Sequence, residues 1–155
     1  MEQKTKVNAE SGKQELEITR EFNLPLDLLF KAYIMPEIIE QWMGTKVLKF
    51  ENKKHGSYQF ETVDAKGNKV FGANGVIHEI VPNKKIIRTF EIDSTPFGVQ
   101  LEIYEFEQLA DNISNLKMHV IYESVEQRDQ VLKLPFAQGI NMAHNRLEEV
   151  ANKIK

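Results

Sequence analysis

Residues 57–109 read SYQFETVDAKGNKVFGANGVIHEIVPNKKIIRTFEIDSTPFGVQLEIYEFEQL. Short runs rich in β-branched and aromatic residues alternate here with turn sequences, such as DAKGN at 64–68 and VPNK at 81–84. Strands joined by such short turns pair antiparallel, because parallel neighbours would need a long crossover connection. The pattern continues on both sides of this stretch. It predicts an antiparallel meander of six strands near residues 46–53, 57–63, 69–80, 85–93, 99–109 and 113–123.

One face of the predicted meander carries large apolar residues and is suited to a core. We assign to it Tyr58, Phe60, Ile86, Phe90, Val99, Leu101, Ile103, Leu116, Met118 and Val120. Gly72 and Gly75 lie inside one run and indicate the bend or bulge that a strongly curved sheet requires. The acids Glu102, Glu105 and Glu107 are most simply a solvated strand face, although a carboxylate pair for glycoside chemistry could lie there.

The segment before the meander starts with a polar stretch. Residues 1–14 show no periodicity, which predicts a flexible N-terminal tail. From residue 15 to Phe22, polar and apolar residues alternate, as in a half-buried strand. Arg20 falls on the apolar side of this strand. Its charged end therefore either reaches water at the sheet edge, the commoner arrangement for a long basic side chain, or is paired inside.

Two short helices are predicted between this strand and the meander. Pro25 favours a helix start, and apolar residues follow at helical spacing up to Tyr33. Pro36 breaks that helix and opens a second one over residues 37–42, which ends at Gly44.

A helical segment over residues 125–133 is followed by a long C-terminal helix that begins near Leu134, because Pro135 fits only a first turn. Its apolar stripe consists of Phe136, Ile140, Ala143, Leu147, Val150 and Ile154, and its polar side of Gln138, Asn141, Asn145, Glu148 and Asn152. An amphipathic helix packs on a partner, and here the partner is the sheet. The fold class is thus α+β: a strand, two short helices, a six-stranded antiparallel meander and a long helix packed in the curved sheet, all in one domain over residues 15–155.

Composition excludes several classes of protein. The chain has 20 Lys and Arg against 23 Asp and Glu, a formal charge of −3, and its basic residues are scattered. Nucleic-acid binders concentrate such residues on one face, so no nucleic-acid partner is predicted. No stretch approaches the ~18 apolar residues of a membrane span. Cysteine is absent, which excludes disulfides and thiolate sites and fits a reducing, cytoplasmic location.

Several short motifs occur in an order and spacing that resemble a known family. They are ITREF (18–22) followed by LP (24–25), LFKAY (29–33), MPE (35–37), QWMG (41–44), GSY (56–58), GVI (75–77), EIVP (79–82) and QGI (138–140). Over roughly residues 14–152 the chain resembles the START-like (SRPBCC) helix-grip superfamily. Within it, the chain is similar to the family named for the C-terminal domain of the activator of heat-shock protein 90 ATPase.

The chain departs from the family pattern at two positions near the expected pocket mouth. Met43 replaces the second aromatic of a Trp-Trp pair, and Thr45 stands where proline is usual. Both changes leave the fold intact but alter the mouth, so the resemblance implies no particular ligand. The co-chaperone activator also carries a separate N-terminal domain that has no counterpart in this sequence. Small stand-alone relatives include proteins that resemble binders of hydrophobic small molecules.

A strongly curved sheet covered by one helix encloses volume that either side chains or a ligand must fill. The residues expected at this place are Trp42, Tyr58, Phe60, Phe90, Tyr104, Met118, Ile140 and Ala143. The resemblance places Trp42 near the cavity mouth. The same side chains could also serve only as core.

No catalytic motif occurs in the sequence. Phosphate-binding glycine loops, Gly-x-Ser-x-Gly and His-Glu-x-x-His are absent, and the four histidines show no metal-ligand spacing. We therefore predict no catalytic residue, cofactor or metal site. An enzyme would need polar groups that converge in the pocket, for which the candidates are Tyr58, His78, Tyr104 and His119.

Two functions from different classes remain. The first is a non-catalytic domain that binds a hydrophobic or amphipathic small molecule between sheet and C-terminal helix. The second, implied by the resemblance, is an interaction domain that engages a chaperone. A continuous void inside the fold would favour the first and a filled interior the second.

Overall fold

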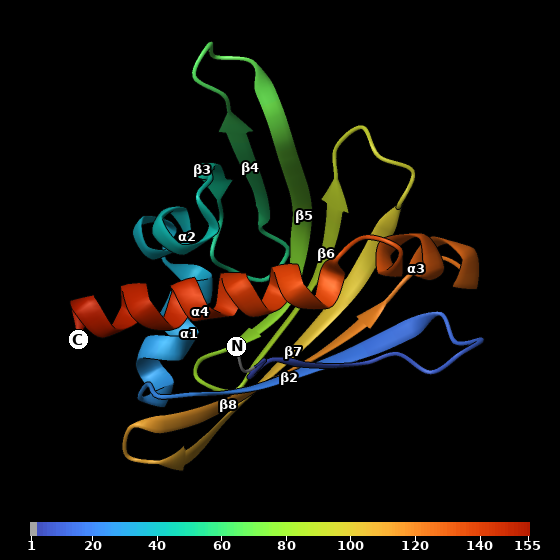
Figure 1. Cartoon of the computed structure of the whole chain (residues 1–155). Helices are drawn as coiled ribbons and strands as arrows, with labels where there is room; N and C mark the ends of the chain where they lie inside the picture. Colours follow the sequence, from blue (N-terminus) through green and yellow to red (C-terminus); the bar gives the residue numbers. More distant parts are fainter. Residues whose placement is uncertain (1–2) are drawn as a thin grey trace.

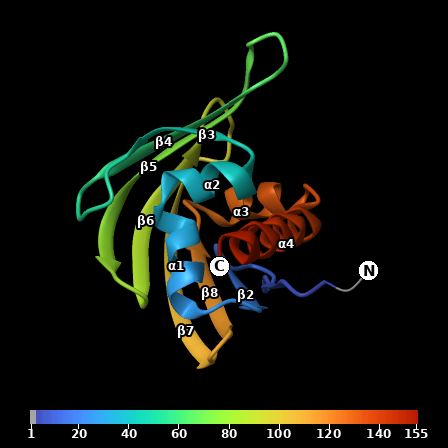
Figure 2. The ribbon, with the colours of Figure 1, turned by 90° about the vertical axis from the view of Figure 1, so that its left-hand side faces the viewer.

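The computed structural model describes residues 3–155 and shows a curved antiparallel sheet with a long helix on its concave side (Figures 1 and 2). Strand β2 (Glu15–Phe22) forms where apolar residues alternate with polar ones, and it buries Leu16, Ile18 and Phe22. Helices α1 (Leu26–Ile34) and α2 (Pro36–Met43) follow. Pro36 occupies the first position of α2, and Gly44 ends that helix with φ 64°, a left-handed conformation that glycine adopts without strain.

The predicted antiparallel meander is confirmed. Its strands are β3 (Lys46–Phe50), β4 (Ser57–Val63), β5 (Lys69–Val81), β6 (Lys85–Ile92), β7 (Val99–Ala110) and β8 (Ile113–Ile121). Strand β8 also pairs antiparallel with β2, and the short strand β1 (Lys6–Asn8) pairs with β2 on its other side. The order in the sheet is therefore β1-β2-β8-β7-β6-β5-β4-β3. The pairing of β2 with β8 places the first long strand beside the last one, and it completes the surface on which the C-terminal helix lies.

Helix α3 (Val125–Leu132) begins at Ser124, whose side chain accepts a hydrogen bond from the backbone N–H of Gln127. Helix α4 (Phe136–Ile154) then crosses the concave face of the sheet, with α1 and α2 beside it (Figures 1 and 2). Leu147 and Ala151 on this helix are fully buried, and Ile154 near its end is 48% exposed. The helix-grip arrangement predicted from the sequence is therefore the fold of the protein.

Strand β5 is irregular, but its register shifts do not fall on its glycines: the register with β4 shifts between Lys69 and Phe71. The register between β5 and β6 shifts between Ile77 and Glu79, which places His78 in the bulge. Gly75 serves a close approach instead: a Cβ at this position would lie 2.5 Å from the Tyr58 hydroxyl, which donates a hydrogen bond to the carbonyl of Thr89. The small residue lets Tyr58 reach across β5 to β6.

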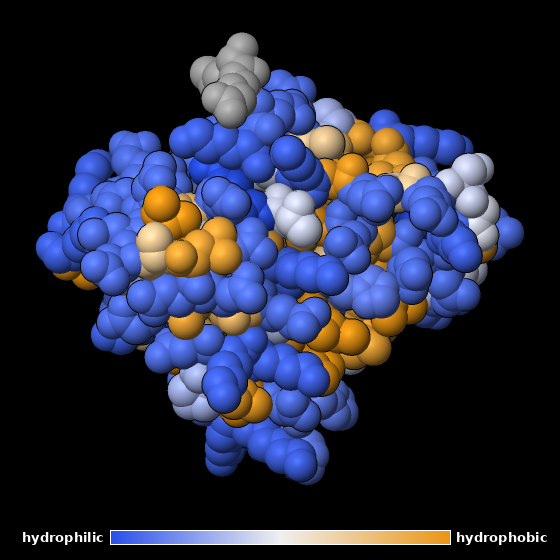
Figure 3. Space-filling view, turned by 90° about the horizontal axis from the view of Figure 1, so that it is seen from below, coloured by the Kyte–Doolittle hydropathy of each residue, from blue (hydrophilic) through white to orange (hydrophobic). Residues whose placement is uncertain are grey.

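The predicted inner face of β7 is wrong by one residue. Glu102, Tyr104 and Phe106 point inward and are buried, while Leu101 and Ile103 lie on the outer face, half-buried. The outer face has its own apolar pairs, such as Ile87 with Ile103 on the neighbouring strand. Figure 3, which views the molecule from below, shows hydrophobic side chains between polar ones on its surface. Both faces of β7 carry apolar residues, so the presence of apolar residues does not identify its inner face. Val99, which the sequence also assigned to the inner face, is 39% exposed.

The expectation of a flexible tail over residues 1–14 is wrong for part of that segment. Residues Lys6–Asn8 form strand β1, which pairs antiparallel with β2. Thr5 is buried; its backbone N–H donates to Asn141 Oδ1 over 3.0 Å, and its hydroxyl lies 2.7 Å from His144 Nδ1. Residues 1 and 2 lie outside the described residues. The segment thus connects the edge of the sheet to α4.

Arg20 on β2 is paired inside the protein. Its side chain is buried rather than at a water-exposed edge, because β1 makes β2 an inner strand and α4 covers it. Its Nη1 donates to Asn145 Oδ1 (2.8 Å) and to Thr5 Oγ1 (3.2 Å), and its Nη2 lies 3.7 Å from Glu148 Oε2. Its guanidinium also stands over the Phe22 ring at 5.0 Å. Of the two alternatives, the inner paired one is found.

These contacts bury part of the polar side of α4. Asn141, predicted on the exposed side of the helix, is buried, and His144 beside it is fully buried. The helix lies in a curved sheet, so more than one stripe of its surface is covered. The polar side of α4, with Asn141 and Asn145, faces β1 and β2, and the apolar stripe, with Ile140 and Ala143, faces a cavity. Among residues 3–155, no helix is both long and apolar enough to cross a membrane.

Candidate functional site

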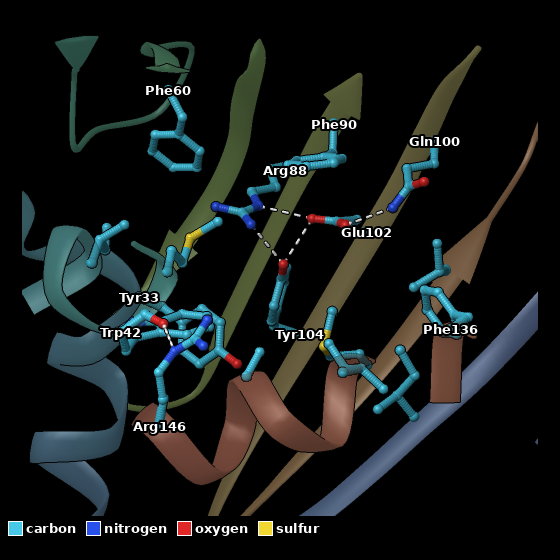
Figure 4. A pocket seen from close by; sticks show the side chains of 17 residues that line it. Tyr33, Trp42, Phe60, Arg88, Phe90, Gln100, Glu102, Tyr104, Phe136 and Arg146 are labelled. Atoms are coloured by element: carbon cyan, nitrogen blue, oxygen red, sulfur yellow. Dashed lines mark hydrogen bonds and ion pairs between the residues drawn. The ribbon is translucent and has the colours of Figure 1, made fainter. Parts of the chain in front are cut away.

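A cavity of about 240 Å³ lies between the sheet, α2 and α4 (Figure 4). Its walls are predominantly apolar and come from β2, α1, α2, β4, β6, β7, β8 and α4, so the cavity is formed by tertiary packing rather than by one motif. The lining residues are Ile18, Tyr33, Ile39, Trp42, Met43, Phe60, Arg88, Phe90, Gln100, Glu102, Tyr104, Met118, Val120, Phe136, Ile140, Ala143 and Arg146.

The structure brings together most of the residues that the sequence suggested. Trp42, Phe60, Phe90, Tyr104, Met118, Ile140 and Ala143 all line the cavity. Tyr58 does not. It is buried behind the cavity wall, where its ring lies 4.8 Å from the Arg88 guanidinium carbon and its hydroxyl bonds to Thr89. Tyr58 therefore supports a lining residue without lining the cavity itself.

The cavity holds a polar cluster that the sequence reading missed, made of Arg88 on β6 and Gln100, Glu102 and Tyr104 on β7 (Figure 4). Arg88 Nε donates to Glu102 Oε1 over 2.9 Å, and Arg88 Nη2 donates to the Tyr104 hydroxyl over 2.7 Å. That hydroxyl donates in turn to Glu102 Oε1 over 2.7 Å. Gln100 Nε2 donates to Glu102 Oε2, also over 2.7 Å. The carboxylate thus accepts three hydrogen bonds.

A sequence signal for this cluster did exist. Arg88 lies two residues from both Ile86 and Phe90, so the period of two places it on their face of β6. Arg88 and Glu102 are direct cross-strand partners in the β6–β7 pair. Reading Glu102 with Glu105 and Glu107 as one solvated face ignored that residues 102 and 105 point to opposite sides of a strand; Glu105 is exposed and Glu102 is buried.

Burial and neighbouring groups together determine the pKa of Arg88 and Tyr104 in the cluster. Burial alone would lower the pKa of the Arg88 guanidinium, but Tyr104, Tyr58 and Glu102 outweigh it and hold that pKa above its usual range. Burial raises the pKa of the Tyr104 hydroxyl well above its ordinary value, against the opposing charge of Arg88. Burial also raises the pKa of the Tyr33 hydroxyl. At neutral pH the cavity therefore presents a fixed cation and protonated phenols.

The rim on the side of α2 is fixed by two hydrogen bonds to backbone carbonyls. Trp42 Nε1 donates to the carbonyl oxygen of Ala32 over 2.8 Å, which fixes the indole against α1. Arg146 on α4 donates from Nε to the carbonyl oxygen of Trp42 over 2.9 Å and joins α4 to the end of α2 (Figure 4). Tyr33 packs edge-on against Trp42 with ring centroids 5.3 Å apart. The rim is thus built from aromatic packing and one exposed arginine.

The remaining polar candidates lie elsewhere. His78 is exposed in the β5 bulge, and His119 points away from the cavity, 2.9 Å from Glu15. His55 and His78 approach each other, with ring centroids 6.1 Å apart. Within residues 3–155, no group of three or more His, Asp or Glu side chains is arranged so that it could hold a metal ion.

Comparisons with known proteins agree with this architecture. The family model described as activator of Hsp90 ATPase homolog 1-like protein matches residues 23–152. A crystal structure of a protein from Rhodobacter sphaeroides superposes with a TM-score of 0.84 at 21% identity, covering 96% of this chain and 99% of that one. A solution structure of a protein from Arthrobacter aurescens gives a TM-score of 0.84 at 15% identity, covering 96% and 91%.

A third similar structure, of a protein from Staphylococcus epidermidis, has a TM-score of 0.77 at 21% identity and covers 94% of each chain. No curated protein matches the sequence. At these identities the solved structures show the fold alone. The family model, in contrast, spans most of the chain, from the end of β2 to the last turns of α4. The chain therefore belongs to the family of activator of Hsp90 ATPase homolog 1-like proteins.

Proposed function

We propose that the domain binds a compact, largely apolar small molecule in the cavity between sheet and α4. The observation that carries this proposal is an apolar cavity with one fixed charge pair, Arg88 and Glu102, in its wall. Ligand pockets combine mostly apolar walls with a few placed polar groups in this way.

The charge pair supports a binding role because stability alone does not require it. Removing two charges from water costs several kcal/mol per ion, and well-packed apolar residues in their place are often as stabilising or more so. The side chains of Arg88 and Glu102 are only 8% and 6% exposed. A costly polar group at the wall of a cavity is typical of a site that meets a ligand.

The size and chemistry of the cavity narrow the ligand. Drug-sized ligands fill pockets of about 300–1,000 Å³, so a cavity of about 240 Å³ suits a smaller molecule. Among the lining residues there is no histidine, lysine or cysteine, and the buried tyrosines stay protonated. The one carboxylate of the lining, Glu102, is engaged by three hydrogen bonds. Acid–base catalysis favours a group that titrates near the working pH. The lining therefore favours binding over catalysis.

The proposal is tested with para-diethylbenzene, a compact hydrocarbon. Trp42 is the single tryptophan, so its indole N–H gives one resolved signal in a proton–nitrogen correlation spectrum. We expect this signal to shift saturably with added hydrocarbon and the melting temperature to rise. A ligand that binds only the folded state stabilises it by about 2.7 kcal/mol at a hundred times Kd.

Two variants of neighbouring residues on α4 give a matched comparison. Ala143 lines the cavity, so Ala143→Phe should fill it and abolish the shift in a folded protein, at a cost of about 1–3 kcal/mol if the site is tight. Met142 is 54% exposed, so Met142→Phe should bind like the wild type. If a broad panel of apolar compounds moves neither the Trp42 signal nor the melting temperature, the proposal fails. The chaperone-interaction alternative, which rests on the family likeness alone, would then take its place.

A further inference from the structure

We propose that the ligand carries an uncharged hydrogen-bond acceptor, such as a ketone, ester or ether oxygen, which binds to Arg88. This inference rests on the proposed function, because it names the class of molecule that the cavity selects. Three features of the polar cluster support it: one donor of Arg88 is unused, the charges of Arg88 and Glu102 balance, and the guanidinium is held rigidly.

The unused donor is Arg88 Nη1. Nε and Nη2 of the same guanidinium are taken by Glu102 and Tyr104. Among the described residues Nη1 has no hydrogen-bond partner, and Figure 4 shows it pointing away from Glu102, toward the part of the cavity where Phe60 lies. The oxygens of Glu102, in contrast, already accept from Arg88, Tyr104 and Gln100. The cluster therefore offers a free hydrogen-bond donor to a ligand, while its acceptor, the Glu102 carboxylate, is already occupied.

The charge balance favours a neutral acceptor over an anion. Arg88 and Glu102 form an ion pair at 2.9 Å, so the cluster as a whole is close to neutral. A carboxylate ligand at Nη1 would lose its hydration and meet the negative field of Glu102 across the guanidinium. A carbonyl oxygen gains a hydrogen bond to a cation without that repulsion.

The guanidinium is held in place before any ligand arrives. Its carbon lies 4.8 Å from the ring centroid of Tyr58 and 4.9 Å from that of Tyr104, in addition to the two hydrogen bonds. A donor fixed in this way loses little freedom when it binds an acceptor. Arg88 thus has the preorganisation that selective binding of an acceptor requires.

The experiment compares three ligands of nearly one shape by calorimetric titration: para-ethylacetophenone, para-ethylbenzoate and para-diethylbenzene. We expect the ketone to bind wild-type protein about tenfold more tightly than the hydrocarbon, the value of one good hydrogen bond to a charged group. We expect the benzoate to bind more weakly than the ketone. Equal affinity for ketone and hydrocarbon would overturn the inference and leave the proposed function standing.

Glu102→Gln provides the sharpest variant. The amide oxygen still accepts from Arg88 and Tyr104, but the negative charge is gone and Arg88 is no longer neutralised. The preference should therefore reverse, with the benzoate binding more tightly than the ketone. A ketone preference that persists in this variant would overturn the argument from charge balance.

The triple variant Arg88→Met, Glu102→Leu, Tyr104→Phe removes the ion pair and the phenol hydroxyl of the cluster without leaving a charge unpaired. It should bind the ketone no better than the hydrocarbon. A ketone preference that persists in the triple variant would overturn the inference. So would a preference of the wild-type protein for benzoate that is lost in Arg146→Gln, because the polar end of the ligand would then bind at the cavity mouth. If none of the three compounds binds wild-type protein, the proposed function itself fails.

Discussion

Leu147 lies in the middle of α4, and its side chain is fully buried between the helix and the sheet. Its neighbours belong to the main core cluster, which joins β2, α1, α2 and the central strands. Truncation at such a site loses the transfer free energy of the removed atoms and leaves a cavity. Single residues on this helix therefore connect elements that are distant in the sequence.

We predict that Leu147→Ala lowers the free energy of unfolding by about 2–5 kcal/mol. The value is read from urea denaturation. Met142→Ala on the exposed side of the same helix is the control and should change the free energy by less than about 0.5 kcal/mol. A midpoint for Leu147→Ala close to wild type would show that α4 does not pack as described.

His144 makes the stability depend on pH. Burial, and then the charge of Arg20, lower the pKa of His144 to about 3 in the folded protein. The unfolded chain has the ordinary value of about 6.5, so between these values only the unfolded state binds the proton. The contribution of His144 is therefore complete above about pH 6.5 and is lost as the pH falls toward 3.

The expected slope from this one residue is about 1.4 kcal/mol of unfolding free energy per pH unit. Urea denaturation at about pH 6.5 and about pH 5 should show wild-type protein losing more stability than His144→Gln over the same interval. Equal losses in the two proteins would mean that His144 is protonated in the folded state.

Among the elements, the short strand β1 connects the sheet to α4. It has only three residues, but it covers β2 at the sheet edge and brings Thr5 to α4. The Thr5 hydroxyl joins His144 at 2.7 Å and accepts from Arg20 at 3.2 Å. Without it, two buried polar side chains would each lose a partner. Strand β1 thus acts as a link between sheet and helix.

We predict that Thr5→Val, which keeps the shape but removes the hydroxyl, destabilises the protein by about 1–3 kcal/mol. In a chain of this size each kcal/mol corresponds to about 2–4 °C of melting temperature. Lys6→Ala, at an exposed position in the same strand, should melt like the wild type. An unchanged melting temperature in Thr5→Val would show that the segment does not dock in solution.

At the scale of the whole molecule, sheet and helices share one main core. The pairing of β2 with β8 joins the first long strand to the last strand, and the core cluster takes residues from α1, α2, α3 and α4 as well as from the sheet. A second, smaller cluster around Tyr58, Phe60 and Ile77 packs beside it. No helix in the described part of the chain is left without contact to this core.

We therefore predict a single cooperative unfolding transition. Trp42 emission reports the α2–α4 rim and far-ultraviolet circular dichroism reports mainly the sheet and helices, and their urea midpoints should coincide. Two separate midpoints would show that the helical layer and the sheet unfold as independent units.

The sequence by itself determined the order of strands and helices and the packing of α4 in the sheet. Local patterns were sufficient there, because the period of two in β2 and the helical spacing after Pro135 depend only on near neighbours. The apolar residues of the cavity wall could also be named in advance: strand alternation indicates the inner face that carries Met118, and the family resemblance implies the place of Trp42.

Only the tertiary structure decided where the buried polar groups lie. Arg88 and Glu102 meet because β6 and β7 pair in one register, and a shift of one residue would turn Glu102 to the outer face. Arg20 is paired inside because β1, too short and polar to be predicted, makes β2 an inner strand. A charged side chain is stable in the interior only with partners, and those partners are brought to it by the fold from distant parts of the chain.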